Sequence, residues 1–139
     1  MCITDSGIIG FAKALELATT NYESDSAYIT ELKLYMMEQL QKNIKGIAFN
    51  GDPIGQSLYA VLSVSFPKTE KSEMILFNLD INHICASGGS ACTSGADQGS
   101  HVIRAINNNP NQVTVRFSFS KHNSKAEIDA VVEKLKELI

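Results

Sequence analysis

The sequence predicts an α+β domain: a small mixed or antiparallel sheet with helices packed on one face. Apolar residues recur with helical period near both ends of the chain, whereas two central segments alternate between apolar and polar residues as strands do. The length of 139 residues and the apolar share of 44% suit a globular domain with its own core. We therefore expect residues 1–139 to form a single domain, in the order α-α-β-β-α-β-α-β-α.

Two helices are expected first. Residues 6–20 and the stretch from about Asp25 to Asn43 carry apolar side chains close to helical spacing. Ile47-Ala48-Phe49 then has the composition of a short strand. The segment 50–53, Asn-Gly-Asp-Pro, predicts a turn because Asn and Gly tolerate positive φ and Pro interrupts a strand ladder.

The middle of the chain predicts strand, helix and strand. Residues 58–66 alternate: one face carries Ala60, Leu62, Val64 and Phe66, and the other carries Tyr59, Val61, Ser63 and Ser65. A helix is expected over Glu73–Leu79. Ile84-Cys85-Ala86 predicts a short strand, and we expect Cys85 to be packed in the core because free cysteine is usually buried.

The last third predicts helix, strand and helix. Ser100–Ile106 has helical spacing and is broken by the run that ends at Pro110. Val113–Phe119 is the cleanest strand, with Arg116 on its polar face. Ser124-Lys125-Ala126-Glu127 forms a capping box, which predicts the start of a final amphipathic helix.

Composition excludes several classes of function. The net charge is −3, Trp is absent and no basic stripe occurs, so we expect no nucleic-acid partner. No apolar run approaches membrane-spanning length and no secretory signal is recognisable, so we expect a cytoplasmic protein without a membrane partner. The three cysteines form no CxxC pair or zinc pattern, which argues against a metal site and a disulfide framework.

The segment Ser87–Gly95, which we call the thiol loop, stands out chemically. It contains three glycines, three serines and Cys92 within nine residues. A thiol on a polar loop suits a nucleophile that moves between an attack site and a delivery site. Two other interpretations exist: Cys92 is a passive small residue, or the loop holds a phosphate, although it lacks the GxxxxGK[ST] pattern.

The thiol loop resembles the active-site loop of group I cysteine desulfurases, the NifS/IscS-like enzymes of the class V aminotransferase superfamily. That loop usually reads SSGSACTS, so Gly88 replaces a serine here. The likeness covers nearly the whole chain. Similar segments are Ile8–Ala14 (family IVGMAKA), Phe49–Asp52 (LNGD), Gly99–Ile106 (PSHVLRAL), Val115–Ser120 (IRFSLGR) and Glu127–Asp129 (EEEID).

The resemblance implies roles for individual residues. Cys92 aligns with the thiol that attacks the sulfur of bound cysteine, which leaves alanine and an enzyme persulfide. Arg116 aligns with the arginine that binds the substrate carboxylate, and a guanidinium fork suits that task; the alternative is an ordinary surface salt bridge. His101 could lie near the thiol. The remaining residues of the loop that we assign to the site are Ser87, Gly88, Gly89, Ser90, Ala91, Thr93 and Ser94.

The resemblance also implies a cofactor and partners. Enzymes of this family use pyridoxal phosphate (PLP), which needs a Schiff-base lysine and a phosphate cup. In the family these belong to a larger N-terminal domain that residues 1–139 do not resemble. We therefore expect the C-terminal small domain of a longer enzyme, without cofactor-binding residues and inactive alone. The implied partners are L-cysteine and a sulfur acceptor, such as an iron–sulfur scaffold or a tRNA-thiolation protein, and family members are homodimers.

Two alternatives remain open at this point. The chain could be a stand-alone persulfide carrier or interaction module. It could also be the small domain of another class V relative, such as a selenocysteine lyase or a plain aminotransferase, although a transaminase has no need of a mobile thiol.

Overall fold

The computed structural model describes residues 3–88, 100–106 and 109–139. Cys92 and the part of the thiol loop from Gly89 onward lie outside the described residues, as does Cys2. The elements in chain order are α1 (Ile3–Asn43), β1 (Ala48–Phe49), β2 (Val61–Pro67), the 3-10 turn η1 (Ser72–Met74), α2 (Ile75–Ile81), α3 (His101–Ile106), β3 (Gln112–Ser118) and α4 (Lys125–Leu138).

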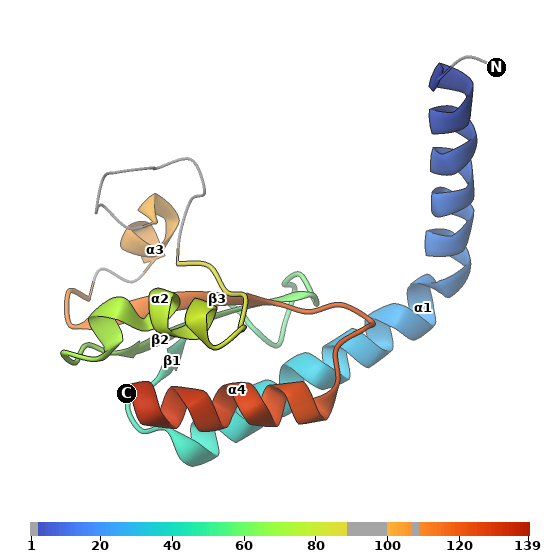
Figure 1. Cartoon of the computed structure of the whole chain (residues 1–139). Coiled ribbons are helices and arrows are strands. Elements are labelled where there is room, and N and C mark those ends of the chain that lie inside the picture. The colour runs from blue at the N-terminus through green and yellow to red at the C-terminus, as the bar shows by residue number, and fades with distance from the viewer. Residues whose placement is uncertain (1–2, 89–99, 107–108) are drawn as a thin grey trace.

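The sheet has three antiparallel strands in the order β1-β2-β3. Leu62, Val64 and Phe66 of β2 point to one face together with Val115 and Phe117 of β3, and all five are buried. The C-terminal half of α1 and the whole of α4 cover that face, whereas α3 lies on the opposite side of the sheet (Figure 1). The expected α+β architecture is therefore confirmed, with an antiparallel sheet.

The first two predicted helices form one continuous helix. Thr19 Oγ1, Thr20 Oγ1 and Asn21 Nδ2 donate hydrogen bonds to backbone carbonyls four residues earlier, at 2.8, 2.8 and 3.0 Å. These bonds satisfy the side-chain donors within the helix, so the polar side chains do not cap a helix end here. Hydroxyl groups bonded in this way often bend a helix, and α1 changes direction near this stretch (Figure 1).

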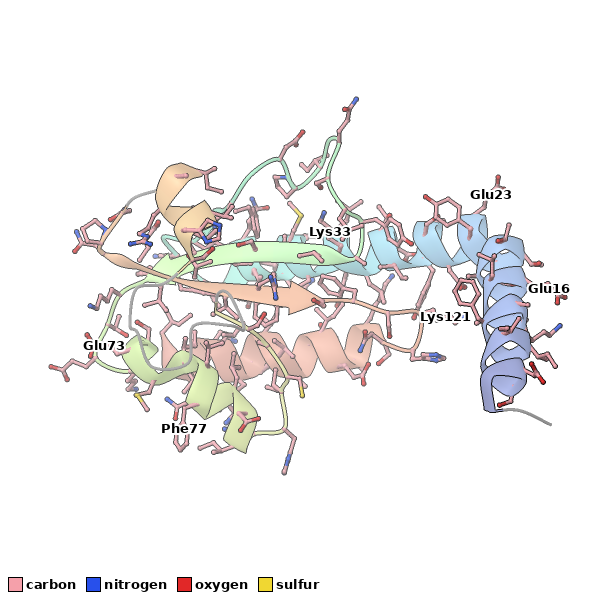
Figure 2. The ribbon with its side chains drawn as sticks, turned by 90° about the horizontal axis from the view of Figure 1, so that it is seen from above. Glu16, Glu23, Lys33, Glu73, Phe77 and Lys121 are labelled. Atoms are coloured by element: carbon pink, nitrogen blue, oxygen red, sulfur yellow. The ribbon has the colours of Figure 1, made fainter. Side chains whose placement is uncertain are left out.

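The two halves of α1 differ in burial. The C-terminal half contributes Leu32, Met36 and Leu40 to the core. In the N-terminal half, large apolar side chains stay uncovered, and Phe11 is 71% exposed. Figure 2 shows Glu16 on this half, which stands apart from the sheet. The helical periodicity of residues 6–20 therefore marks an apolar face without a partner among the described residues: Ile8, Ile9, Phe11 and Leu15.

The expected strand at residues 84–86 and the burial of Cys85 are wrong. Only Ser87 forms a bridge to β3, and Cys85 is exposed. The segment leaves α2 through His83, whose φ is 62°, and runs along the edge of the sheet without a neighbouring strand over it. Alternation buries a side chain only where another layer covers it, and among the described residues no layer covers Cys85.

The capping box is confirmed. Ser124 Oγ accepts a hydrogen bond from Glu127 N at 3.3 Å, and Glu127 Oε2 accepts one from Ser124 N at 2.7 Å. The apolar face of α4 places Ile128, Val132 and Leu135 in the core. The cap therefore fixes the start of α4 and with it the layer beneath the sheet.

Candidate active site

The backbone of Arg116 is joined to the start of the thiol loop. Arg116 N donates to Ser87 O at 2.6 Å, and Ser87 N donates to Arg116 O at 3.1 Å. These two bonds form an isolated antiparallel bridge on the free edge of β3. Because directly opposed residues point to the same face of a sheet, the side chains of Ser87 and Arg116 lie on the same side. The sequence analysis assigned Ser87 and Arg116 to the site separately, and the structure brings them together.

On its other flank Arg116 faces Ser63 of β2. The carbonyl of Ser63 accepts a hydrogen bond from Asn50 N at 3.0 Å, so the backbone polar groups of Ser63 point toward β1, while those of Arg116 point toward Ser87. Ser63 and Arg116 thus form a non-hydrogen-bonded pair, the type that brings side chains closest, with Cα atoms about 4.5 Å apart. Asn50, Ser63, Arg116 and Ser87 form one row across the sheet.

A hydrogen-bond network covers this face of the sheet. Asn50 Nδ2 donates to Ser63 Oγ at 3.1 Å and to Ser65 Oγ at 2.9 Å. Ser65 Oγ donates in turn to Asn50 Oδ1 at 3.1 Å and lies 3.0 Å from Thr114 Oγ1. Ser65 is only 1% exposed, so this network is a fixed part of the fold. The face opposite the core is therefore polar and preorganised around Arg116.

Arg116 is exposed. The ion pairs found within residues 3–88, 100–106 and 109–139 all join lysines to carboxylates, and none includes Arg116. The surface salt bridge considered above is thus not formed among these residues. A guanidinium fork in this position is chemically able to bind a carboxylate with two parallel hydrogen bonds.

Gly88 follows the bridge and lies against α2. A Cβ atom at this position would be 2.5 Å from Leu76 Cδ1 and 3.6 Å from Thr114 O. A side chain at this position would displace the end of Leu76. Because glycine has none, the backbone at Gly88 can lie close to α2. Gly89, Ser90, Ala91, Cys92, Thr93 and Ser94 lie outside the described residues.

His101 begins α3 and is exposed. Ser100 precedes it, and Ile103 N donates to Ser100 Oγ at 3.4 Å. No contact between His101 and Ser87 or Arg116 is found, so a role for His101 near the thiol remains a prediction.

Ser63 and Asn50 were not singled out from the sequence. The alternation in residues 58–66 placed Ser63 and Ser65 on one face, and Asn50 belonged to the predicted turn. The missing information was the strand register, because no local pattern tells which residue of β3 lies opposite Ser63.

Among the described residues, the buried lysine has a structural role. Lys33 is the buried lysine, 3% exposed, on the half of α1 beside the sheet (Figure 2). Its Nζ donates to Ser57 Oγ at 3.1 Å and to Leu58 O at 3.2 Å, so it stabilises the segment that leads into β2. Burial lowers the pKa of Lys33 below its usual range, and the nearby charge of Asp52 opposes this shift.

The described residues include no group of three or more His, Cys, Asp or Glu side chains that could hold a metal ion. None of their helices has the length and apolar character needed to span a membrane.

The sequence model of the Aminotransferase class-V family matches residues 4–131. The chain belongs to the class-V aminotransferase family. A cysteine desulfurase of Nostoc sp. is 36% identical over 135 residues, which cover 96% of this chain and 33% of that protein. The cysteine desulfurase IscS of Dictyoglomus turgidum is 33% identical over 137 residues, covering 96% and 34%. The mitosomal cysteine desulfurase of Encephalitozoon cuniculi is 31% identical over 134 residues, covering 95% and 30%.

Solved structures agree on the fold. A NifS-like protein superposes with a TM-score of 0.74 at 26% identity, covering 94% of this chain and 32% of that one. The NifS-like protein of Rickettsia africae gives a TM-score of 0.73 at 23% identity, covering 93% and 33%. The expected membership of a NifS/IscS-like class V family is therefore confirmed. This class-V aminotransferase chain spans about a third of the length of the relatives it matches.

Proposed function

We propose that this chain is the thiol-bearing C-terminal small domain of a cysteine desulfurase. In this proposal Cys92 takes the sulfur of L-cysteine as a persulfide and alanine is released. The similarity to proteins named cysteine desulfurase supports the reaction class. The observation that carries the proposal is the bridge between Ser87 and Arg116, which joins the candidate carboxylate-binding group to the first residue of the thiol loop.

The proposal assigns two tasks to the chain. Arg116, which is exposed on the polar face of β3, binds the carboxylate of L-cysteine with its guanidinium fork. Cys92 follows Ser87 by five residues in the sequence, and an extended chain of that length spans about 17 Å. The thiol therefore has enough reach to approach a substrate held at Arg116 and to carry sulfur away from it.

The reaction balances without an external oxidant. The bond between carbon and sulfur in L-cysteine breaks, the sulfur becomes the outer atom of the Cys92 persulfide, and the three-carbon skeleton gains hydrogen and leaves as alanine. The PLP of the parent enzyme would be held by its larger N-terminal domain, as the family resemblance implies. A sulfur acceptor, either an iron–sulfur scaffold or a tRNA-thiolation protein, would then receive the outer sulfur in the cytoplasm.

The apolar N-terminal half of α1 supports the assignment as one part of a longer protein. Ile8, Ile9, Phe11 and Leu15 are between 56% and 71% exposed. Contiguous apolar surface of this kind usually marks an interface, and the matched relatives are about three times as long as the match. In the proposal, the remainder of a homodimeric parent enzyme covers this face.

The test compares Cys92 with Cys85 in the full-length parent. Cys92→Ala is expected to abolish sulfide release from L-cysteine in the presence of a thiol reductant, because no persulfide forms for the reductant to cleave. Cys85→Ala is the matched control, since Cys85 is exposed, lies seven residues earlier, and has no assigned role. Normal sulfide release by the Cys92→Ala variant would refute the proposal.

A further inference from the structure

We propose that Ser63 is a second carboxylate-binding residue, whose hydroxyl donates a hydrogen bond to the substrate carboxylate held by Arg116. The inference rests on the function proposed above and names a specificity residue for it. Two observations support it: the position of Ser63 directly opposite Arg116 in the sheet, and the hydrogen-bond network beside Arg116.

The position of Ser63 follows from the strand register. Ser63 is the direct partner of Arg116, and the two form a non-hydrogen-bonded pair. Side chains in such a pair are the closest neighbours that two antiparallel strands provide, with Cβ atoms about 5 Å apart. A carboxylate bound to the guanidinium of Arg116 therefore lies within reach of a donor on Ser63.

The network leaves the Ser63 hydroxyl with a hydrogen to donate. Ser63 Oγ accepts from Asn50 Nδ2 at 3.1 Å, and no bond donated by Ser63 Oγ is found among the described residues. Ser65 differs, because its hydroxyl donates to Asn50 Oδ1 at 3.1 Å. With its oxygen fixed by Asn50, the Ser63 hydroxyl has its remaining hydrogen available for an acceptor.

The two serines also differ in access. Ser65 is 1% exposed, whereas Ser63 is half-buried, as expected for a group that contacts a small ligand. A carboxylate has two oxygens and several acceptor directions, so one hydroxyl donor can bind beside a bidentate guanidinium. Asn50 is then a positioning residue, because it acts by orienting Ser63.

The experiment uses the full-length parent enzyme with Ser63→Ala, Ser63→Thr and Arg116→Lys variants. Two quantities are measured: kcat and KM for L-cysteine, and the Kd of L-alanine by calorimetry, since alanine carries the carboxylate without the thiol. Ser118→Ala is the matched control, because Ser118 lies on the same face of β3, opposite Val61. Circular dichroism verifies that each variant is folded.

We expect Ser63→Ala to raise KM and the Kd of alanine roughly tenfold, as for the loss of one bond to a charged group. The kcat value should stay within about twofold because the thiol is untouched, and Ser63→Thr should retain binding. Unchanged KM and Kd in Ser63→Ala, or a fall in kcat alone, would overturn the role of Ser63. If Arg116→Lys also left both quantities unchanged, the proposed carboxylate site itself would fail.

Discussion

Arg116 is held in place from both sides of β3. Ser87 fixes its backbone on one edge and Ser63 lies opposite it on the other, while its guanidinium stays free of ion pairs within the described residues. The charge is thus presented on a rigid strand and remains available to a ligand.

Replacing Arg116 by lysine should weaken substrate binding. We expect Arg116→Lys in the parent enzyme to raise KM for L-cysteine by roughly 10- to 100-fold, because an ammonium group cannot bind a carboxylate with a planar fork. Steady-state kinetics provide the measurement, with Arg104→Lys on exposed α3 as the control. Equal KM values for the two variants would contradict the assignment.

The burial of Lys33 predicts how the stability of the chain depends on pH. Burial lowers its pKa in the folded state below the unfolded value of 10.5, so between these two pKa values the unfolded chain binds more protons. Stability conferred through this group therefore rises with pH in that window. Urea denaturation of the wild type and of Lys33→Met gives the free energy of unfolding of each at about pH 7 and about pH 10. The wild-type value minus the variant value should be larger at about pH 10. A smaller difference at the higher pH would contradict the prediction.

The strands were predicted from the sequence more successfully than their pairing. The strand expected over Val113–Phe119 is found at Gln112–Ser118, because alternation is a local property of one segment. The pairing of Ser63 with Arg116 could not be predicted, because register depends on two segments that are far apart in the sequence. Cys85 was misjudged for a related reason, since burial depends on whether another layer covers the segment.

Helix α1 illustrates an ambiguity in residue propensity. The apolar spacing predicted two helices, over residues 6–20 and from about Asp25 to Asn43, and the residues between them include Asn and Ser, which favour helix caps. The same side chains can instead bond to the carbonyls of the preceding turn, and in this chain they do so. Sequence cannot distinguish the two outcomes, because both use the same polar groups.

The capping box of α4 is expected to contribute measurable stability. Ser124→Ala should lower the free energy of unfolding by about 1 kcal/mol, because Glu127 N loses its acceptor. Ser124→Asp should restore most of that loss, since aspartate is an equally good cap. Urea denaturation of the three proteins checks this, and equal stability of Ser124→Ala and the wild type would show that the cap contributes little.

At the scale of the whole molecule, the uncovered face of α1 predicts self-association of the isolated chain. Phe11→Lys should lower the weight-average mass of the chain in sedimentation experiments, because it places a charge within the apolar face. Ile54→Lys is the matched control, since Ile54 is 76% exposed outside that face. A monomeric wild-type chain at every concentration, or equal effects of both substitutions, would contradict this interpretation.

The central claim is that Cys92 forms a persulfide with sulfur from L-cysteine. The most direct measurement is mass spectrometry of the parent enzyme after brief incubation with L-cysteine, alkylation and digestion. We predict that the peptide containing Cys92 gains one sulfur atom, while the thiol of Cys85 remains unmodified except by the alkylating agent. An active enzyme in which Cys92 never carries the additional sulfur would contradict the account.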